Sequence, residues 1–183
     1  MNLPRTTDPS ALPDGVQRVA AFLRTSGHRH APHMLDAAAR TAQQAADALG
    51  IALGQIAKSI VFRRNSDDAA VLVITSGDRR VDEHKVAAIV CRDGARLGRA
   101  DADFVKARTG FSIGGVAPVA HAQACVTLID RELFRFGNEI WAAAGHPHAV
   151  FKLTPADLQH LTGAPVADVV ETAHTAHHGT ASP

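Results

Sequence analysis

Cysteine and aromatic residues are scarce in this sequence of 183 residues, and no long apolar run is present. Two cysteines, Cys91 and Cys125, cannot supply the disulfide framework of a small secreted domain. Without a run of about 20 apolar residues, a membrane-spanning helix is not expected. Residues 1–12 lack the basic start and apolar centre of a signal peptide. We therefore expect a protein of the reducing cytoplasm that does not enter a membrane.

Net charge is also low, at +1 near pH 7, so the chain as a whole does not attract nucleic acid. The basic residues are nevertheless concentrated in the middle of the sequence, at Arg63, Arg64, Arg79, Arg80, Lys85, Arg92, Arg96, Arg99, Lys106 and Arg108. They could form a local face for a phosphate backbone, or they could be spread over a solvated surface. Charge runs of this kind slightly favour the solvated surface.

The remaining composition is that of an ordinary globular domain, with 46% hydrophobic and 20% charged residues. The length is sufficient to bury a core. Because no internal repeat or linker is visible, we expect a single domain over residues 1–171, with its core at about 27–170. The last residues, 172–183, are rich in Ala, Thr and His and are expected to be a disordered tail.

Hydrophobic periodicity, caps and turn residues predict the elements of structure. Helices are expected over 15–25, from a cap at Asp36 to Leu49, from a cap at Asp82 to Val90, over 102–107, and from a cap at Thr154 to Gly163. Strands are expected over 55–62, 69–75, 124–130, 139–144, 149–153 and 166–170. Strands and helices do not alternate regularly, so the pattern indicates the α+β class. We expect a mixed, strongly curved, barrel-like sheet with flanking helices.

Lys58 stands in an unusual place for a charged residue. Residues two apart in a strand share a face, so Lys58 lies with Ile56, Ile60 and Phe62. A charged amine among apolar groups is costly unless an anion meets it. Two interpretations are equally open. The lysine could bind a ligand phosphate, or it could lie on an edge strand, reach into water and discourage aggregation.

A glycine-rich loop over 109–118 contains the pair Gly114-Gly115 and ends at Pro118. Glycine allows a backbone to approach a ligand closely. Two successive amides in such a loop could donate to one oxygen, as ester hydrolysis requires when the carbonyl oxygen gains negative charge. One donor of this kind contributes about 2.7–4 kcal/mol to transition-state stabilisation. Taken alone, however, the pair is more typical of an ordinary turn between strands.

The histidines do not have the spacing of a metal site. His146 and His148 could share a strand face, and His121 lies four residues before Cys125, but no third ligand or carboxylate accompanies either pair. We expect no metal and no cofactor, and we interpret His148 as a polar pocket wall. Cys91 is expected to be a structural thiol. The sequence also shows no phosphate-binding P-loop pattern and no convincing nucleophile with its base.

Several of these features occur together in one order. The lysine strand is followed by Gly77-Asp78-Arg79-Arg80-Val81-Asp82, by the glycine-rich loop, and by Ala144-Gly145-His146-Pro147-His148. In this order they resemble the YbaK/EbsC family, which includes the editing domain of bacterial prolyl-tRNA synthetase and its free-standing relatives. The resemblance covers about residues 27–170. It implies a twisted mixed sheet with surrounding helices, and hydrolysis of a wrong amino acid from the 3′ end of a tRNA, most often tRNA for proline.

The resemblance also implies roles for individual residues. Lys58 is similar to the family lysine near the terminal adenosine and its phosphate, whereas Gly114 and Gly115 are similar to the loop that receives the aminoacyl carbonyl. A water molecule would attack the ester, aided by the ribose hydroxyl of the substrate. The residues expected to bind substrate around them are Ile113, Val116, Pro118 and His148.

The expected partner is therefore a mischarged tRNA, bound at its 3′ aminoacyl-adenosine end, and prolyl-tRNA synthetase is a second candidate partner. A small uncharged amino acid such as Ala, Cys or Ser is the expected leaving group, because synthetases discriminate a methylene by only ~1–3 kcal/mol. Two alternatives remain. The chain could be a non-catalytic module of the same fold that binds aminoacyl-tRNA or a synthetase, or a metal-dependent hydrolase built on the histidines.

Overall fold

The computed structural model describes residues 12–92 and 94–172. The predicted disordered tail lies almost entirely outside this part of the chain. The strands are β1 (His33–Met34), β2 (Ile56–Arg64), β3 (Ala69–Ser76), β4 (Leu97–Arg99), β5 (Val126–Asp130), β6 (Ile140–His146), β7 (Ala149–Leu153) and β8 (Val166–Ala167). The helices are α1 (Asp14–Thr25), α2 (Ala42–Leu49), α3 (Glu83–Val90), α4 (Ala102–Thr109) and α5 (Pro155–Thr162), with short 3-10 helices η2 (Leu53–Gln55) and η3 (Arg131–Phe136).

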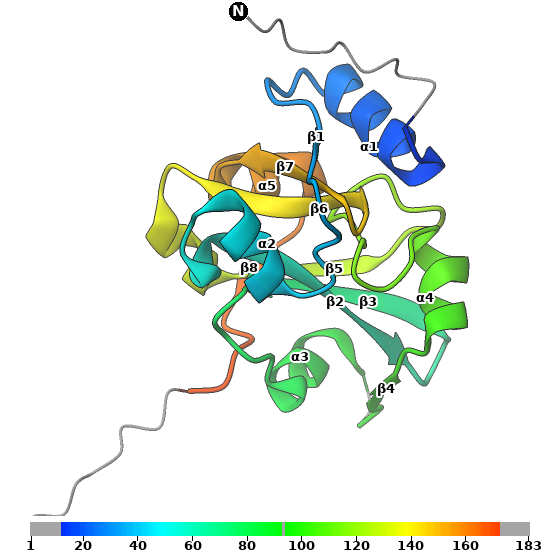
Figure 1. Cartoon of the computed structure of the whole chain (residues 1–183). Coiled ribbons are helices and arrows are strands. Elements are labelled where there is room, and N and C mark those ends of the chain that lie inside the picture. Colours follow the sequence, from blue (N-terminus) through cyan, green and yellow to red (C-terminus); the bar gives the residue numbers. More distant parts are fainter. Residues whose placement is uncertain (1–11, 93, 173–183) are drawn as a thin grey trace, which may run out of the picture.

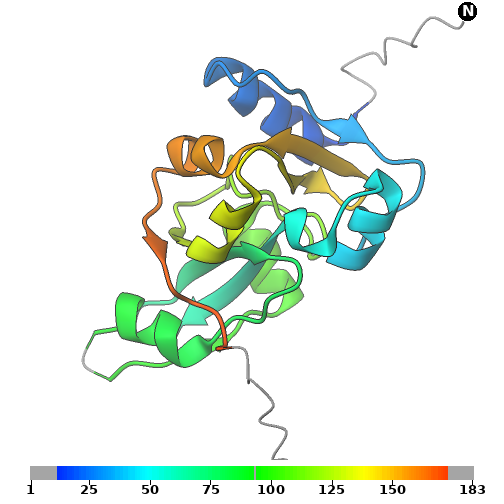
Figure 2. The ribbon, with the colours of Figure 1, turned by 90° about the vertical axis from the view of Figure 1, so that its left-hand side faces the viewer.

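One mixed sheet organises the described residues. Its strand order is β1-β7-β6-β2-β3-β5-β8, and β4 pairs separately with β2. The β2–β3 hairpin is antiparallel, whereas β2–β6, β3–β5 and β5–β8 are parallel. Helix α1 lies at one end of the molecule and α3 with β4 at the other (Figure 1, Figure 2). The predicted α+β class with a mixed sheet and flanking helices is confirmed, but the sheet is open and does not close into a barrel.

Both faces of the sheet are covered, as the alternation along β3 shows. Leu72 and Ile74 belong to the main core with α1, α4 and α5, whereas Val71 and Val73 pack with α3 on the opposite face. Successive side chains of a strand point to opposite faces, so a strand covered on both sides is apolar throughout. Helix α2 completes the packing by covering Ile56 near the β6–β7 pair.

Caps predicted from the sequence define several helix ends. The Asp82 side chain accepts from the backbone amides of His84 and Lys85 at the start of α3. Thr154 and Asp157 form a reciprocal capping box at the start of α5, with Pro155 in its first turn. Such caps satisfy amides that have no partner within the helix. The predictions of these two helix starts are confirmed.

The prediction that Asp36 caps the second helix is wrong. Helix α2 begins after Thr41, whose side chain accepts from the Gln44 amide in a capping box. The preceding segment is extended along the β6–β7 turn, where the amides of Leu35 and Ala39 donate to the carbonyls of His148 and Pro147. These long-range hydrogen bonds replace the local ones that a longer helix would have made.

Several short elements were not expected from the sequence, namely β1, β4, η2 and η3. The last predicted strand is also shorter than expected, because β8 ends at Ala167 and Val170 forms only an isolated bridge with Val81. Two- and three-residue strands have no periodicity to detect, and their pairing depends on distant partners. None of the helices in the described ranges is long and apolar enough to cross a membrane.

Candidate functional site

A cavity lies where the sheet separates beside β2. Strand β2 pairs with β6 only at Ile56 and Ala57, and with β4 only from Phe62 to Arg64. Within the described residues, positions 58–61 therefore have no neighbouring strand on that side. A cavity of about 290 Å³ occupies this region, between β2, β6, α2 and the glycine-rich loop.

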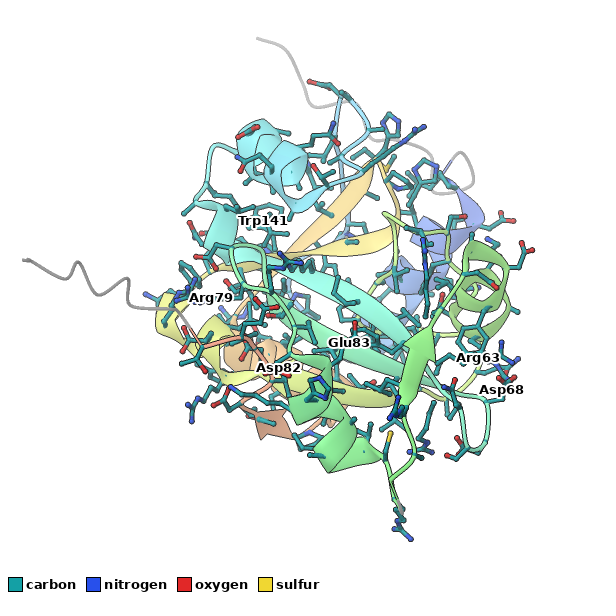
Figure 3. All side chains as sticks on the ribbon, turned by 90° about the horizontal axis from the view of Figure 1, so that it is seen from below. Arg63, Asp68, Arg79, Asp82, Glu83 and Trp141 are labelled. Atoms are coloured by element: carbon teal, nitrogen blue, oxygen red, sulfur yellow. The ribbon has the colours of Figure 1, made fainter. Side chains whose placement is uncertain are left out.

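The walls of the cavity are mostly apolar, and many are alanines. Its lining includes Ala42, Ala45, Ala57, Ala142, Ala143, Ile60, Val116 and Trp141. Trp141 lies beneath α2 (Figure 3), where it packs with the apolar cluster of that helix. Small side chains on facing elements leave space that larger ones would fill. The polar side chains at the cavity are few, as is usual for a small-ligand site.

Lys58 is one of those polar groups. Its Nζ donates to the backbone carbonyls of Gly77 (3.3 Å) and Arg79 (2.5 Å), in the loop after β3. Strand β2 has partners on both sides, but at Lys58 the side facing the cavity has no neighbouring strand among the described residues. The Lys58 Nζ bonds backbone carbonyls instead of extending into water, so the structure does not bear out the interpretation of a lysine that reaches into solvent from an edge. An ammonium group has three protons, so one remains for a ligand after these two bonds.

The pKa of Lys58 is set by its burial and by two charged neighbours. Partial burial lowers the pKa of the Lys58 ammonium below its usual value, nearby Asp78 acts to raise it, and Arg80 acts to lower it. Burial also acts to raise the pKa of Asp78, but hydrogen bonds from Arg135 and Ser76 outweigh this, and the pKa is lowered. Asp78 therefore stays ionised near Lys58, and both of its carboxylate oxygens accept from one guanidinium nitrogen of Arg135, Nη2.

The glycine-rich loop brings Gly114 to the same cavity. Gly114 has a φ of +90°, a conformation that residues with a side chain rarely adopt. The amide of Gly115 donates to the Ser112 carbonyl at 3.0 Å, which closes a turn. The Gly114 amide has no hydrogen-bond partner within the described ranges. Of the two predicted donors, the Gly114 amide is thus the one without a hydrogen bond in the described ranges. The Gly115 amide could serve a ligand only by sharing or exchanging its turn bond.

His146, which the sequence suggested only as one of a possible metal pair with His148, is a candidate for another role in the structure. It lines the cavity, whereas the predicted His148 lies beside it, with ring centres 5.5 Å apart. The backbone amide of His148 donates to His146 Nδ1, so a neutral His146 carries its proton on Nε2. Burial, and then the charge of His148, lower the pKa of His146. At neutral pH it is therefore an uncharged hydrogen-bond donor.

The other predicted residues divide into two groups. Ile113 and Val116 line the cavity together with Lys58 and Gly114. Pro118 is buried behind the loop and does not line it. Its substrate-binding role, like that of His148, stays a prediction.

Arg40 is a residue that sequence reasoning missed. It is exposed at the rim of the cavity beside Gly114, and no carboxylate pairs with it among the described residues. Its segment was expected to be helical, so no signal in the sequence placed it beside the loop. His146, in contrast, belongs to the turn that the resemblance included.

The basic residues of the middle segment do not form one free face. Six of the ten pair with carboxylates, and Arg63 and Asp68 point toward each other at the far end of the hairpin (Figure 3). This arrangement agrees with the solvated-surface interpretation. No cluster of three or more His, Cys, Asp or Glu residues with metal-binding geometry occurs in residues 12–92 and 94–172.

The open mixed sheet with flanking helices is the fold of aminoacyl-tRNA editing domains, as the match to a solved structure of 40% identity shows. The chain belongs to the aminoacyl-tRNA editing domain family, whose model matches residues 36–161. The resemblance to YbaK-like editing domains is thereby confirmed.

Relatives and solved structures agree with this assignment. Uncharacterized protein YwhH of Bacillus subtilis (strain 168) is 31% identical over 122 residues, which are 67% of this chain and 74% of YwhH. A proline--tRNA ligase of Pelotomaculum thermopropionicum is 31% identical over 112 residues, 61% of this chain but 18% of the ligase. A solved structure described as a proposed trans-editing enzyme for prolyl tRNA synthetase is 40% identical, with a TM-score of 0.80. That match covers 88% of this chain and 100% of the other.

Proposed function

We propose that this chain is an aminoacyl-tRNA deacylase that hydrolyses the ester of a mischarged tRNA in trans, in the cytoplasm. The substrate we propose is tRNA for proline carrying a small amino acid. The observation that carries the proposal is that Lys58 and Gly114 line one cavity with apolar walls. The family assignment supports an aminoacyl-tRNA as substrate. The matches to a proline--tRNA ligase and to a proposed prolyl trans-editing enzyme support the choice of tRNA.

The size of the cavity suggests which part of the substrate lies inside it and which part lies at its rim. Its volume of about 290 Å³ lies just below the range for ligand sites, about 300–1,000 Å³. It suits the aminoacyl group, and the terminal adenosine would then lie at the rim. Ile113, a residue that is 59% exposed, offers an apolar surface to the base there. Arg40 offers a guanidinium that can bind a phosphate with two hydrogen bonds.

The chemistry follows from the groups at the cavity. The ester carbonyl oxygen would accept from the Gly114 amide, and its developing charge would be stabilised there. Lys58 would donate its remaining hydrogen bond to the terminal nucleotide. His146 would donate a hydrogen bond to the substrate through Nε2. Water adds to the acyl carbon, the bond to the ribose oxygen breaks, and that oxygen takes up the proton. The products are the free amino acid and the uncharged tRNA.

A panel of mischarged tRNAs tests the proposal. Purified protein should release the amino acid from at least one tRNA for proline that carries Ala, Cys or Ser. Lys58→Ala should lower the rate by at least ~10-fold, the scale of one lost ionic hydrogen bond. Lys85→Ala is the matched control, because Lys85 pairs with Asp168 away from the cavity. Binding of these tRNAs without any hydrolysis would instead identify a non-catalytic module.

A further inference from the structure

Helix α1 precedes the segment that matches the family, yet it packs against β6, the strand that carries His146 of the cavity. Its buried residues Val16, Val19 and Leu23 belong to the main core with β6 and β7. Gly15 lies against Gly145 at the end of β6, so closely that a Cβ on either glycine would overlap the other residue's carbonyl oxygen. The helix is therefore held in a fixed position beside the β6–β7 turn.

Arg18 extends from α1 to the glycine-rich loop. Its Nε donates to the Ala120 carbonyl at 2.9 Å, and its Nη2 donates to the Thr109 carbonyl at 3.4 Å. The guanidinium carbon also lies 4.4 Å from the centre of the Phe111 ring. Thr109 and Ala120 stand on either side of the loop that carries Gly114. One side chain thus joins the two ends of that loop.

The backbone at the end of the loop has a strained conformation, which contacts such as those of Arg18 can hold in place. Ala120 has a φ of +61°, a left-handed conformation that costs a residue with a Cβ about 1–2 kcal/mol. The Thr109 carbonyl also accepts from the Ala122 amide, and His121 bonds the Ala117 carbonyl. The backbone therefore leaves the loop in a strained conformation that the surrounding hydrogen bonds maintain.

We infer that Arg18 is a positioning residue for the catalytic loop, and that α1 is a working part of the editing site. The inference rests on the proposed function, because it concerns the placement of the Gly114 amide against the ester carbonyl. Arg18 does not line the cavity, so it acts through the loop and not on the substrate. Its planar group can bond two carbonyls and stack on Phe111 together, which a lysine ammonium cannot do.

Loss of this connection should affect turnover more than binding. A misplacement of about 1 Å at a reacting group can lower a rate by roughly 100-fold. We expect Arg18→Ala to reduce kcat by about 10- to 100-fold, with KM changed by less than about 3-fold. Arg18→Lys should recover only a small part of kcat. Arg24→Ala is the matched control, since Arg24 is exposed on the same helix and has no bond to the loop.

Chemical rescue separates positioning from general stability. Arg18 is partly exposed, so added guanidinium at millimolar, non-denaturing concentration can reach the space left in Arg18→Ala. Added guanidinium should raise the kcat of Arg18→Ala several-fold. It should not raise the kcat of Lys58→Ala. A wild-type kcat in Arg18→Ala, or an equal loss in Arg24→Ala, would overturn the inference. If Arg18→Ala does not fold, Arg18→Lys and Arg18→Met carry the same comparison.

Amide hydrogen exchange keeps this inference separate from the proposed function. Absence of hydrolysis by the wild-type protein would count against the function alone. The loop can still be followed through the amides of Gly115 and Ala122, which bond Ser112 and Thr109. In Arg18→Ala these amides should exchange at least about 10-fold faster, while those of β3 keep their protection. Unchanged exchange at both amides would show that Arg18 does not hold the loop.

Discussion

Gly115 packs with its α-carbon against the backbone of His146, so that a Cβ on Gly115 would stand 2.8 Å from the His146 carbonyl carbon. This contact joins the glycine-rich loop, whose Gly114 lines the cavity, to the end of β6. The atoms that a side chain would meet are all backbone, so they cannot rotate away. The absence of a side chain at position 115 is thus a geometric requirement of the site.

Gly115→Ala should therefore displace the loop. We expect the deacylation rate to fall by at least ~10-fold, and overpacking of this kind costs typically about 1–3 kcal/mol of stability. Gly163→Ala is a control with a comparable cost, since Gly163 has a φ of +62° but open space around it and lies after α5. Rates measured per folded molecule should separate the two variants. A Gly115→Ala protein with the wild-type rate would contradict this account of the loop.

Filling the cavity should block the substrate without harming the fold. Ala143 is half-buried in β6 and lines the cavity, so Ala143→Leu adds apolar volume within about 290 Å³. We expect kcat/KM to fall by at least ~10-fold, because one methylene group that does not fit a pocket changes the free energy of transition-state binding by ~1–3 kcal/mol. The melting temperature should stay the same or rise. Ala156→Leu, at an exposed position of α5, should leave both quantities unchanged. Undiminished kcat/KM in Ala143→Leu would mean that the substrate binds elsewhere.

The pH dependence of the rate should report on Lys58. Burial lowers the pKa of Lys58, and the negative charge of Asp78 opposes this. Asp78→Asn removes that opposition, so the pKa of Lys58 should fall further and its charge should be lost at a lower pH. The alkaline decline in rate, after subtraction of spontaneous ester hydrolysis, should move to lower pH. Asp168→Asn, next to Lys85, should not move it. A shift to higher pH in Asp78→Asn would rule out this interpretation.

Asp130 offers a test on stability alone. Its side chain is fully buried and accepts from Thr75 Oγ1 at 3.1 Å, but Oδ1 has no hydrogen-bond partner among the described residues. Burial raises the pKa of Asp130 in the folded state. The folded protein then binds the proton more tightly than the unfolded chain, so the ionised carboxylate destabilises the fold above that pKa. The penalty decreases as pH falls through the raised pKa toward its usual value.

Asp130→Asn should remove this penalty at neutral pH. We expect the free energy of unfolding to rise on the order of 1 kcal/mol at pH 7, the scale of one hydrogen bond. The difference from wild type should shrink at mildly acidic pH. Urea unfolding at both pH values measures this, with exposed Asp36→Asn as the control. A variant that is less stable than wild type at pH 7 would show that the ionised carboxylate is needed.

Much of the fold could be read from local patterns. The apolar runs over 55–62 and 69–75 predicted strands β2 and β3, and Asp82 and Thr154 predicted where α3 and α5 begin. These predictions succeeded because a cap or an alternating face depends on residues close in the sequence. The start of α2 was missed because carbonyls of the β6–β7 turn, more than 100 positions away, accept the amides before Thr41.

The candidate site was only partly predictable for the same reason. Lys58 stood out because a charge in an apolar strand requires a partner, and Gly114 because glycine permits a positive φ. His146 and Arg40 line the same cavity, but the sequence suggested His146 only as one of a possible metal pair, and it gave Arg40 no distinguishing feature.

The sequence by itself determined most of the longer elements, the caps at Asp82 and Thr154, and the two unusual features, a lysine in an apolar strand and a pair of glycines. Only the tertiary structure decided that Lys58 and Gly114 meet at one cavity, that the Gly115 amide is already bonded, and that Arg18 joins the ends of the loop. The physical reason is that local conformation depends on neighbouring residues. A binding site, in contrast, is made by long-range contacts between segments whose separation in the chain carries no periodic signal.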